Sequence, residues 1–526
     1  MSRFRKTRPW SVLLLSAVAT LYCAVPTSVN AQRVAAHNPV IWADVPDPSV
    51  IRVDSAYYMT STTMHLSPGV PILKSNNLVD WHLVGYVYET LANADALNLR
   101  AGQNAYGRGS WASSLRYHDG IFYVATFSYT TGESYVFTTH DIETGPWRKA
   151  SLGRLFHDAS LFFDGGRAFL VYGAGDIRIL ELTPDAQSVK QDGVDRVLIN
   201  NVGGIVGTEF YVPGEGSQLF KIDGRYYLFL IAWPRGGMRT QLVYRADSLD
   251  GPWEGRVVLQ DQGIAQGGIV DTPEGDWYAL LFGDRGAVGR IPYLVPTTWE
   301  AGWPVLGADG RVPNTLDVES DGTGVSGIVA SDEFSSDALA PVWQWNHNPV
   351  QRLWSLTDRP GFLRLTSGRT DASFVDTRNT LTQRTFGPVS SAVTKLDASG
   401  LNDGDTAGLG LLQEDYTFVG VRRTAGRSNV VMVAHQDGAA RELASLPVDR
   451  DVVYLRVSCD FRDRKDQANL SYSLDGENWV PIGSTFRMRY TLGHFMGARF
   501  ALFNYSTQTP GGHVDFDYFR LSQTPD

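Results

Sequence analysis

The chain has 526 residues, of which 43% are apolar and 19% charged. This composition is typical of a soluble globular protein, and this length indicates two or three domains. A formal charge of −10 makes nucleic acid a poor partner, and two cysteines, Cys23 and Cys459, exclude a framework of several disulfides.

Residues 1–31 have the pattern of a secretory signal peptide. A basic start with Arg3, Arg5, Lys6 and Arg8 precedes an apolar run over residues 11–25, and small residues stand near Ala31. The run is too short to span a membrane. We therefore expect a secreted protein, periplasmic or extracellular and without a membrane partner. Removal of the four basic residues would lower the formal charge from −10 to −14.

Residues 32–303 repeat one layout five times: a head of small and polar residues, an apolar run, turn residues and an aromatic run. The heads of the five copies are at Asp47, Ala112, Asp158, Glu215 and Gln266. Pairs such as Asp119-Gly120 and Asp223-Gly224 fill the gaps, which is a hairpin signal. Five successive hairpins with the same layout predict a five-bladed β-propeller.

The rest of the chain is also predicted to be β-structure. Residues 304–328 are rich in Gly, Asp and Ser, and indicate a linker or an extended crossing segment. Residues 329–526 contain short alternating strands without the blade period, which favours a β-sandwich of jelly-roll type. Helical periodicity is weak throughout, with residues 88–100 as the one modest candidate.

The heads of the repeats carry the predicted chemistry. The first strand of each propeller blade lines the central channel, so we expect Asp47, Asp158 and Glu215 to meet near the axis. Glycoside hydrolysis needs one carboxylic acid to protonate the leaving oxygen and one carboxylate to activate water or attack carbon. A third carboxylate raises the pKa of the acid and orients it. The same cluster could instead chelate a cation.

The motifs resemble those of glycoside hydrolase family 43, whose members are five-bladed propellers acting as inverting β-xylosidases, α-L-arabinofuranosidases and arabinanases. The resemblance lies in Pro46-Asp47-Pro48-Ser49, Trp111-Ala112-Ser113-Ser114-Leu115, His157-Asp158-Ala159-Ser160-Leu161-Phe162, Glu215-Gly216-Ser217 and Val288-Gly289-Arg290. Segments around Asp332-Glu333-Phe334 and residues 343–348 and 515–519 resemble the concanavalin-like sandwich domain of the family's β-xylosidases.

The resemblance implies a role for each site residue. Asp47 corresponds to the general base that deprotonates water, Glu215 to the general acid, and Asp158 to the pKa modulator that orients Glu215. Trp111 and Arg290 match substrate-contacting positions.

Two further sites depend on this resemblance. Gln266 is expected to contact substrate, at a place where many members carry a His that is sometimes linked to a metal. Asp332 with Asp517 could hold a structural Ca²⁺, or they could be ordinary turn acids. No cofactor is expected to be required.

The sequence thus predicts a secreted, exo-acting glycosidase. It would release β-D-xylose or α-L-arabinofuranose from hemicellulose such as xylan or arabinoxylan, by an inverting mechanism, and its partner is an oligosaccharide or polysaccharide substrate. One alternative is a retaining, fructan-cleaving propeller enzyme. The other is a non-catalytic carbohydrate-binding protein. The presence of all three acids argues against it, because binding alone does not need them.

Overall fold

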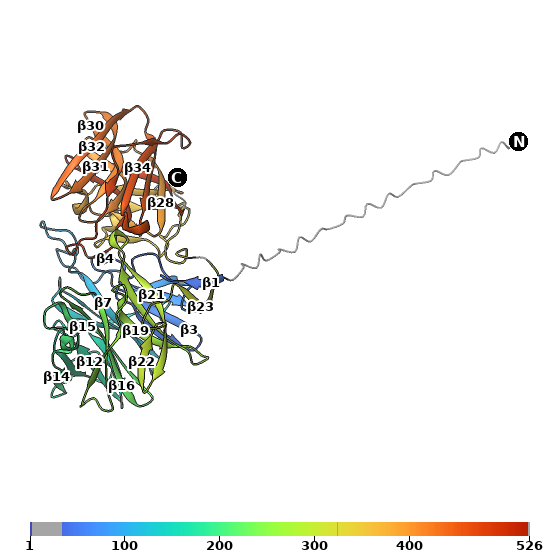
Figure 1. Ribbon diagram of the computed structural model, residues 1–526. Helices are drawn as coiled ribbons and strands as arrows, with labels where there is room; N and C mark the ends of the chain where they lie inside the picture. Colours follow the sequence, from blue (N-terminus) through green and yellow to red (C-terminus); the bar gives the residue numbers. More distant parts are fainter. Residues whose placement is uncertain (3–33, 323, 524–526) are drawn as a thin grey trace.

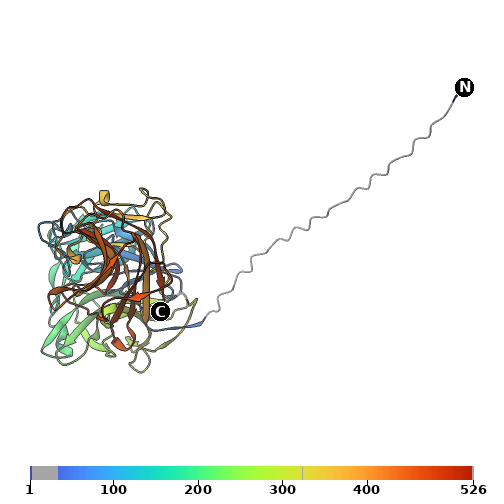
Figure 2. The ribbon, with the colours of Figure 1, turned by 90° about the horizontal axis from the view of Figure 1, so that it is seen from above.

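The computed structural model describes residues 1–2, 34–322 and 324–523, so almost all of the expected signal peptide lies outside the described residues. Two all-β domains are stacked on each other, the N-terminal one blue to yellow and the C-terminal one orange to red (Figure 1; Figure 2). Helical structure in the described ranges consists of short 3-10 turns: η1 (Val202–Ile205), η2 (Gly286–Val288), η3 (Gln351–Leu353), η4 (Phe374–Asp376) and η5 (Arg462–Arg464). None of the described helices is long and apolar enough to traverse a membrane.

The N-terminal domain is the predicted five-bladed β-propeller, in which each blade is an antiparallel sheet of four strands. Blade one contains β2 (Ser49–Val53), β3 (Ala56–Thr60), β5 (Gly69–Ser75) and β6 (His82–Tyr88). Blade two contains β7 (Ser110–His118), β8 (Ile121–Ser128), β9 (Glu133–Thr139) and β10 (Arg148–Ser151). Blade three contains β11 (Ser160–Asp164), β12 (Arg167–Tyr172), β13 (Ile177–Leu182) and β14 (Asp195–Ile199). Blade four contains β15 (Phe210–Ile222), β16 (Arg225–Pro234), β17 (Thr240–Ala246) and β18 (Glu254–Leu259). Blade five contains β19 (Ala265–Asp271), β20 (Trp277–Asp284), β21 (Arg290–Glu300) and β22 (Trp303–Leu306).

The predicted hairpins form because their turn residues adopt the backbone that tight turns need. His118 pairs with Ile121 across Asp119-Gly120, whose φ angles are 49° and 77°. Ile222 pairs with Arg225 across Asp223-Gly224 in the same way, with φ angles of 50° and 80°. Positive φ at both central residues follows the right-handed twist of the strands, and Asp and Gly tolerate it best.

The segment 304–328, expected to be a linker or crossing segment, contributes to two sheets. β22 ends inside it and completes blade five. β23 (Thr315–Ser320) pairs antiparallel with β1 (Val34–His37), which ties the beginning of the described domain to its end. The boundary of the propeller therefore extends beyond residue 303.

The C-terminal domain is a sandwich of two antiparallel sheets, as expected. One sheet has the order β32-β31-β30-β29-β37-β27-β24-β4, with β32 (Ala439–Val448), β31 (Arg427–Gln436), β30 (Thr417–Thr424), β29 (Asp405–Leu412), β37 (Arg499–Ser506), β27 (Leu381–Arg384), β24 (Gln344–Asn346) and β4 (Leu66–Ser67). The other has the order β25-β26-β38-β28-β33-β34-β35, with β25 (Trp354–Ser355), β26 (Leu363–Thr366), β38 (His513–Ser522), β28 (Val389–Asp397), β33 (Val452–Asp460), β34 (Gln467–Ser473) and β35 (Val480–Pro481), while β36 (Phe486–Arg487) pairs with β34. Cys459 is buried in this domain as a free thiol.

The two domains share structure at their interface. β4 comes from the propeller but pairs with β24 of the sandwich, so one sheet crosses the boundary. Residues 88–100 do not form the helix that we considered. They run as turns along the interface, where the Asn348 side-chain amide donates to the Ala92 carbonyl at 2.9 Å. These contacts fix the sandwich against the propeller.

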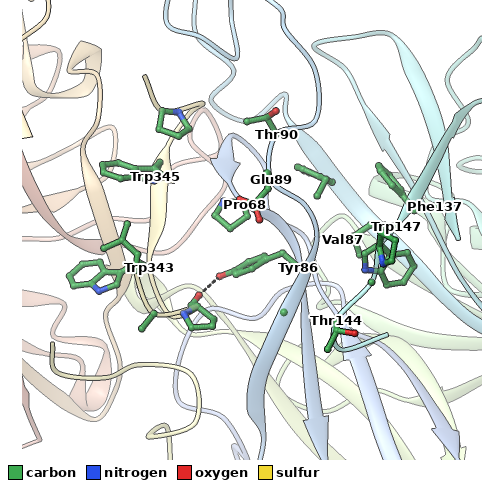
Figure 3. Close-up of a pocket in the computed structure, with 18 of the residues that line it drawn as sticks. Pro68, Tyr86, Val87, Glu89, Thr90, Phe137, Thr144, Trp147, Trp343 and Trp345 are labelled. Atoms are coloured by element: carbon green, nitrogen blue, oxygen red, sulfur yellow. Dashed lines mark hydrogen bonds between the residues drawn. The ribbon is translucent and has the colours of Figure 1, made fainter. Parts of the chain in front are cut away.

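A cleft of about 700 Å³ lies between blades one and two and the sandwich. Figure 3 shows Tyr86 between Trp343 and Trp147, with its hydroxyl donating to the carbonyl of Pro341 at 2.9 Å. No described residue lines both this cleft and the pocket at the propeller axis. The cleft is thus separate from the candidate active site.

Candidate active site

The first strands of the blades surround a pocket at the propeller axis, to which all five blades contribute. Its lining consists of Asp47, Pro48, Ala112, Ser113, Asp158, Ala159, Gly216, Ser217, Gln218, Gln266 and Gly267. Ligand atoms of His157, Asp158 and Glu215 all lie within 4.8 Å of one another, and Asp158 interacts electrostatically with Asp47. The three acids of the sequence pattern therefore cluster at the axis: Asp47 and Asp158 line the pocket, and Glu215 lies beside Asp158.

The strand register corrects one detail of the predicted pattern. Ser49, Ser160 and Gln218 hold the same place opposite the second strands of their blades. The residue two places before each of them is Asp47, Asp158 or Gly216, not Glu215. The expected equivalence of the three acids is therefore wrong by one residue in blade four, where a bulge lies between Glu215 and Gln218.

The backbone at these positions explains which residues occupy them. Asp47, Asp158 and Gly216 have φ angles of 52°, 47° and 71°, in the left-handed region that Asp and Gly adopt at low cost. The Gly216 N–H points at the neighbouring blade and donates to Asp158 Oδ2 at 3.1 Å. The bulge thus provides a backbone donor for Asp158 and places Glu215 beside that carboxyl group.

Asp47 is held by two donors in a dry environment. Arg290 Nη1 donates to Asp47 Oδ1 at 2.9 Å, and the hydroxyl of Thr62 donates to Oδ2. The side chains of Arg290 and Asp47 are only 4% and 5% exposed, so solvent hardly competes for this pair. Donors on both oxygens stabilise a carboxylate, which is the form that a general base requires.

Asp44 places Arg290 and links it to the sandwich. Asp44 Oδ1 accepts from the Arg290 backbone N–H at 2.7 Å, and Oδ2 accepts from the Gly497 N–H at 2.9 Å. Gly289 permits this approach, because a Cβ there would lie 2.2 Å from Asp44 Oδ1. Burial raises the pKa of Asp44, although the charge of Arg290 and the two backbone donors act against burial. Asp44 therefore has a hydrogen-bonding role beside the pocket.

The acids on the opposite side of the pocket share a histidine. His157 Nε2 lies 2.9 Å from Glu215 Oε2 and 3.8 Å from Asp158 Oδ2. Burial raises the pKa of Asp158 to about 7, with further increases from the charges of Glu215 and Asp47, against the lowering effect of His157. Burial alone would lower the pKa of His157, but the charge of Asp158 and the hydrogen bond with Glu215 raise it to about 9. The surroundings of His157 and Asp158 therefore favour their protonated forms near neutral pH.

Two predicted substrate contacts carry free donors. Arg290 Nε and Nη2 and Trp111 Nε1 are buried and have no protein partner. Phe495, from the sandwich, lies 4.6 Å from the Trp111 ring and 4.5 Å from the Arg290 guanidinium, measured to ring centroids. Sequence reasoning missed Phe495, because no local pattern links residue 495 to the propeller. The third predicted contact, Gln266, lines the axial pocket.

The carboxylates considered for calcium already have protein partners. Asp332 accepts from the Phe334 N–H and from Trp343 Nε1, both at 2.8 Å, whereas Asp517 pairs with Lys395 Nζ at 2.6 Å. These contacts favour the alternative of structural acids. Among the described residues, the cluster with metal-ligand spacing is His157, Asp158 and Glu215 instead.

Two family models match this chain. The model of glycosyl hydrolases family 43 matches residues 36–304. The model of the beta xylosidase C-terminal concanavalin A-like domain matches residues 331–522. These ranges correspond to the propeller and to the sandwich.

Similar proteins agree with this division. A beta-xylosidase of Formosa agariphila is 29% identical over 92% of this chain and 89% of its own. A putative beta-xylosidase of Xylanibacter ruminicola is 33% identical over 86% of this chain and 84% of its own. A solved structure described as a bifunctional GH43-CE from Bacteroides eggerthii is 53% identical, with a TM-score of 0.92; it covers 94% of this chain, which spans only 64% of that one. With the matched propeller, the matched sandwich and the acids at the axis, the chain belongs to glycosyl hydrolase family 43.

Proposed function

We propose that this glycosidase releases single pentoses from the ends of hemicellulose chains with inversion at the anomeric carbon. The observation that carries the proposal is the convergence of Asp47 from blade one with Asp158 and Glu215 from blades three and four. Asp47 has the fixed, donor-bound carboxylate of a base. Glu215 stands among groups that hold protons near neutral pH.

The reaction follows from these positions. Asp47 removes a proton from water as the water oxygen bonds to the anomeric carbon. The bond from that carbon to the leaving oxygen breaks, and Glu215 delivers a proton to the leaving oxygen. Asp158 orients Glu215 through the shared cluster and the Gly216 N–H. Positioned acid and base catalysis of this kind contributes about 10²–10⁴-fold for each group, and the chemistry requires no cofactor.

The boundary of the pocket supports exo action. Phe495 from the sandwich covers Trp111 and Arg290, so a second domain limits the space beside the catalytic carboxylates. The free donors of Arg290 and Trp111 are suited to sugar hydroxyls. Few directed donors under an aromatic cover favour one terminal sugar unit over the middle of a long chain.

The relatives support pentoses as substrates. The names of the two relatives above describe β-xylosidases, whereas a relative from Bacteroides ovatus, 30% identical over 62% of this chain, is described as a non-reducing end α-L-arabinofuranosidase. Because the β-xylosidase relatives cover more of the chain, we favour β-D-xylose and keep α-L-arabinofuranose as the second candidate. The N-terminal signal pattern supports a secreted enzyme acting in the periplasm or the medium.

Hydrolysis of 4-nitrophenyl β-D-xylopyranoside, 4-nitrophenyl α-L-arabinofuranoside and xylobiose tests the proposal. The wild type should hydrolyse at least one of the pentosides, and Asp47→Asn should lower kcat about 10²–10⁴-fold with intact folding. Arabinoxylan should yield monosaccharides without a ladder of oligosaccharides. Oligosaccharide products would contradict exo action, and an unchanged kcat in Asp47→Asn would contradict its role as the base.

A further inference from the structure

The imidazole of His157 connects the proposed acid to a tyrosine at the edge of the pocket. Its Nε2 lies 2.9 Å from Glu215 Oε2, and its Nδ1 lies 3.0 Å from the hydroxyl of Tyr129. The ring also packs edge-on against Phe127, with 5.3 Å between centroids. Both ring nitrogens are therefore engaged, and the orientation of the imidazole is fixed by groups from blades two and four.

The direction of these hydrogen bonds follows from their chemistry. A carboxylate oxygen of Glu215 accepts, so His157 Nε2 carries the hydrogen between them unless Glu215 carries it. The titratable groups that face the ring are Glu215 from blade four, Asp158 on its own segment and Tyr129 from blade two. Two of the three are acids, and their charges favour the imidazolium form, in agreement with the raised pKa of His157.

A proton donor beside Glu215 meets a need of the inverting cycle. Each turnover moves one proton from Glu215 to the leaving oxygen and one proton from water to Asp47. Before the next turnover Glu215 must gain a proton and Asp47 must release one. A histidine that contacts Glu215 directly and has its other nitrogen on a partly exposed tyrosine can serve the first of these steps.

We propose that His157 and Glu215 hold one proton between them and work as a single acid, in which His157 is the positioning residue that returns a proton to Glu215. The inference rests on the proposed function. The O–H bond of Glu215 breaks as the leaving oxygen takes its proton and retains the electron pair of the broken C–O bond. His157 then takes a proton from solvent to become an imidazolium, and its Nε2–H passes to Glu215, which leaves His157 neutral and the pair with its one proton again.

Tyr129 gives this pair a connection to water. Its side chain is 38% exposed, and its hydroxyl can both donate and accept, so it can pass a proton to Nδ1 from the solvent side. Because His157 Nε2 lies 2.9 Å from Glu215 Oε2, the proton that the two groups share belongs to neither of them alone. His157 thus extends to higher pH the range in which the pair still has a proton to deliver.

The kinetic test compares pH profiles of kcat/KM for the wild type and His157→Gln. In His157→Gln the alkaline limb should move to lower pH by roughly one to two units, because this shift corresponds to the free energy of one charge-assisted hydrogen bond. The loss at pH 8 should be at least about tenfold larger for xylobiose than for the 4-nitrophenyl glycoside, because nitrophenolate leaves without a proton. Tyr129→Phe should give a smaller shift in the same direction, and the matched control His140→Gln, an exposed histidine, should give none. An alkaline limb that stays in place or moves up in His157→Gln would overturn the proposal.

A second measurement needs no substrate. NMR titration of the His157 ring protons should place its pKa near 9 in the wild type, and lower in Glu215→Gln. Equal midpoints in the two proteins would also refute the shared proton. Loss of activity on dialysis against EDTA, restored by a divalent cation, would instead assign His157, Asp158 and Glu215 to a metal. A wild type that turns over no pentoside would refute the proposed function and leave the titration as the test of the pair.

Discussion

Breaking the buried ion pair between Arg290 and Asp47 should destabilise the propeller strongly. The change Arg290→Met replaces the guanidinium, which lies over the rings of Phe282 and Phe495, by an apolar side chain of similar length. It removes the partner of a carboxylate that is 5% exposed. It leaves the backbone hydrogen bond from residue 290 to Asp44 in place. The strand should therefore remain, and the cost should come from the uncompensated charge.

The magnitude follows from the burial of the pair. Removing one member of a buried ion pair costs about 3–5 kcal/mol. For a domain of this size, each kcal/mol lowers Tm by about 2–4 °C, so Arg290→Met should lower the Tm of the propeller transition by about 6–20 °C. Differential scanning calorimetry can resolve this transition.

The double variant identifies the cause of the loss. Asp47→Asn in the Arg290→Met background removes the unpaired charge and should recover a large part of the lost Tm, although both proteins are inactive. A single variant that melts like the wild type would show that solvent reaches Asp47. A double variant no more stable than the single one would show that Arg290 contributes packing and not charge.

Three further predictions concern protons, metals and the mouth of the pocket. The pKa of His157 is raised in the folded state, so protonated His157 stabilises the fold fully below its ordinary pKa of 6.5, and this stabilisation is lost as pH rises through about 9. The Tm of the wild type should therefore fall between these pH values, and the Tm of His157→Gln should fall less. Dialysis against EDTA should leave kcat unchanged, because both oxygens of Asp47 already have protein donors and Nε2 of His157 already contacts Glu215; loss of activity that a divalent cation restores would contradict this. Phe495→Ala removes the ring over Trp111 and should raise KM for xylobiose several-fold while opening the pocket to longer chains; an unchanged ratio of kcat/KM for xylobiose and xylotetraose would contradict this role.

The propeller was predictable because its signals are local and repeated. Asp119-Gly120 and Asp223-Gly224 fix hairpins by the backbone that they tolerate, and five copies of one layout leave few alternative folds. The repeated layout also located Asp47 and Asp158 at the heads of their strands, and the structure shows the left-handed backbone that favours Asp there. It placed Glu215 one residue out of register, because a bulge has no reliable signature in the sequence.

The contacts that complete the site were beyond prediction because they join distant segments. His157 and Glu215 are 58 residues apart and meet only when blades three and four close around the axis. Phe495 reaches Trp111 through the packing of a second domain, in which β4 of the propeller becomes a strand of the sandwich. Such pairs follow from tertiary packing and leave no periodic pattern in the chain.

The most direct test of the central claim is the anomeric configuration of the first product. Proton NMR spectra recorded within the first minutes of hydrolysis of 4-nitrophenyl β-D-xylopyranoside should show α-D-xylose appearing first, with the β anomer growing in later by mutarotation. This order is required if Asp47 activates water while Glu215 protonates the leaving oxygen. Initial release of β-D-xylose would mean a covalent intermediate and would contradict the assignment of Asp47 as a base.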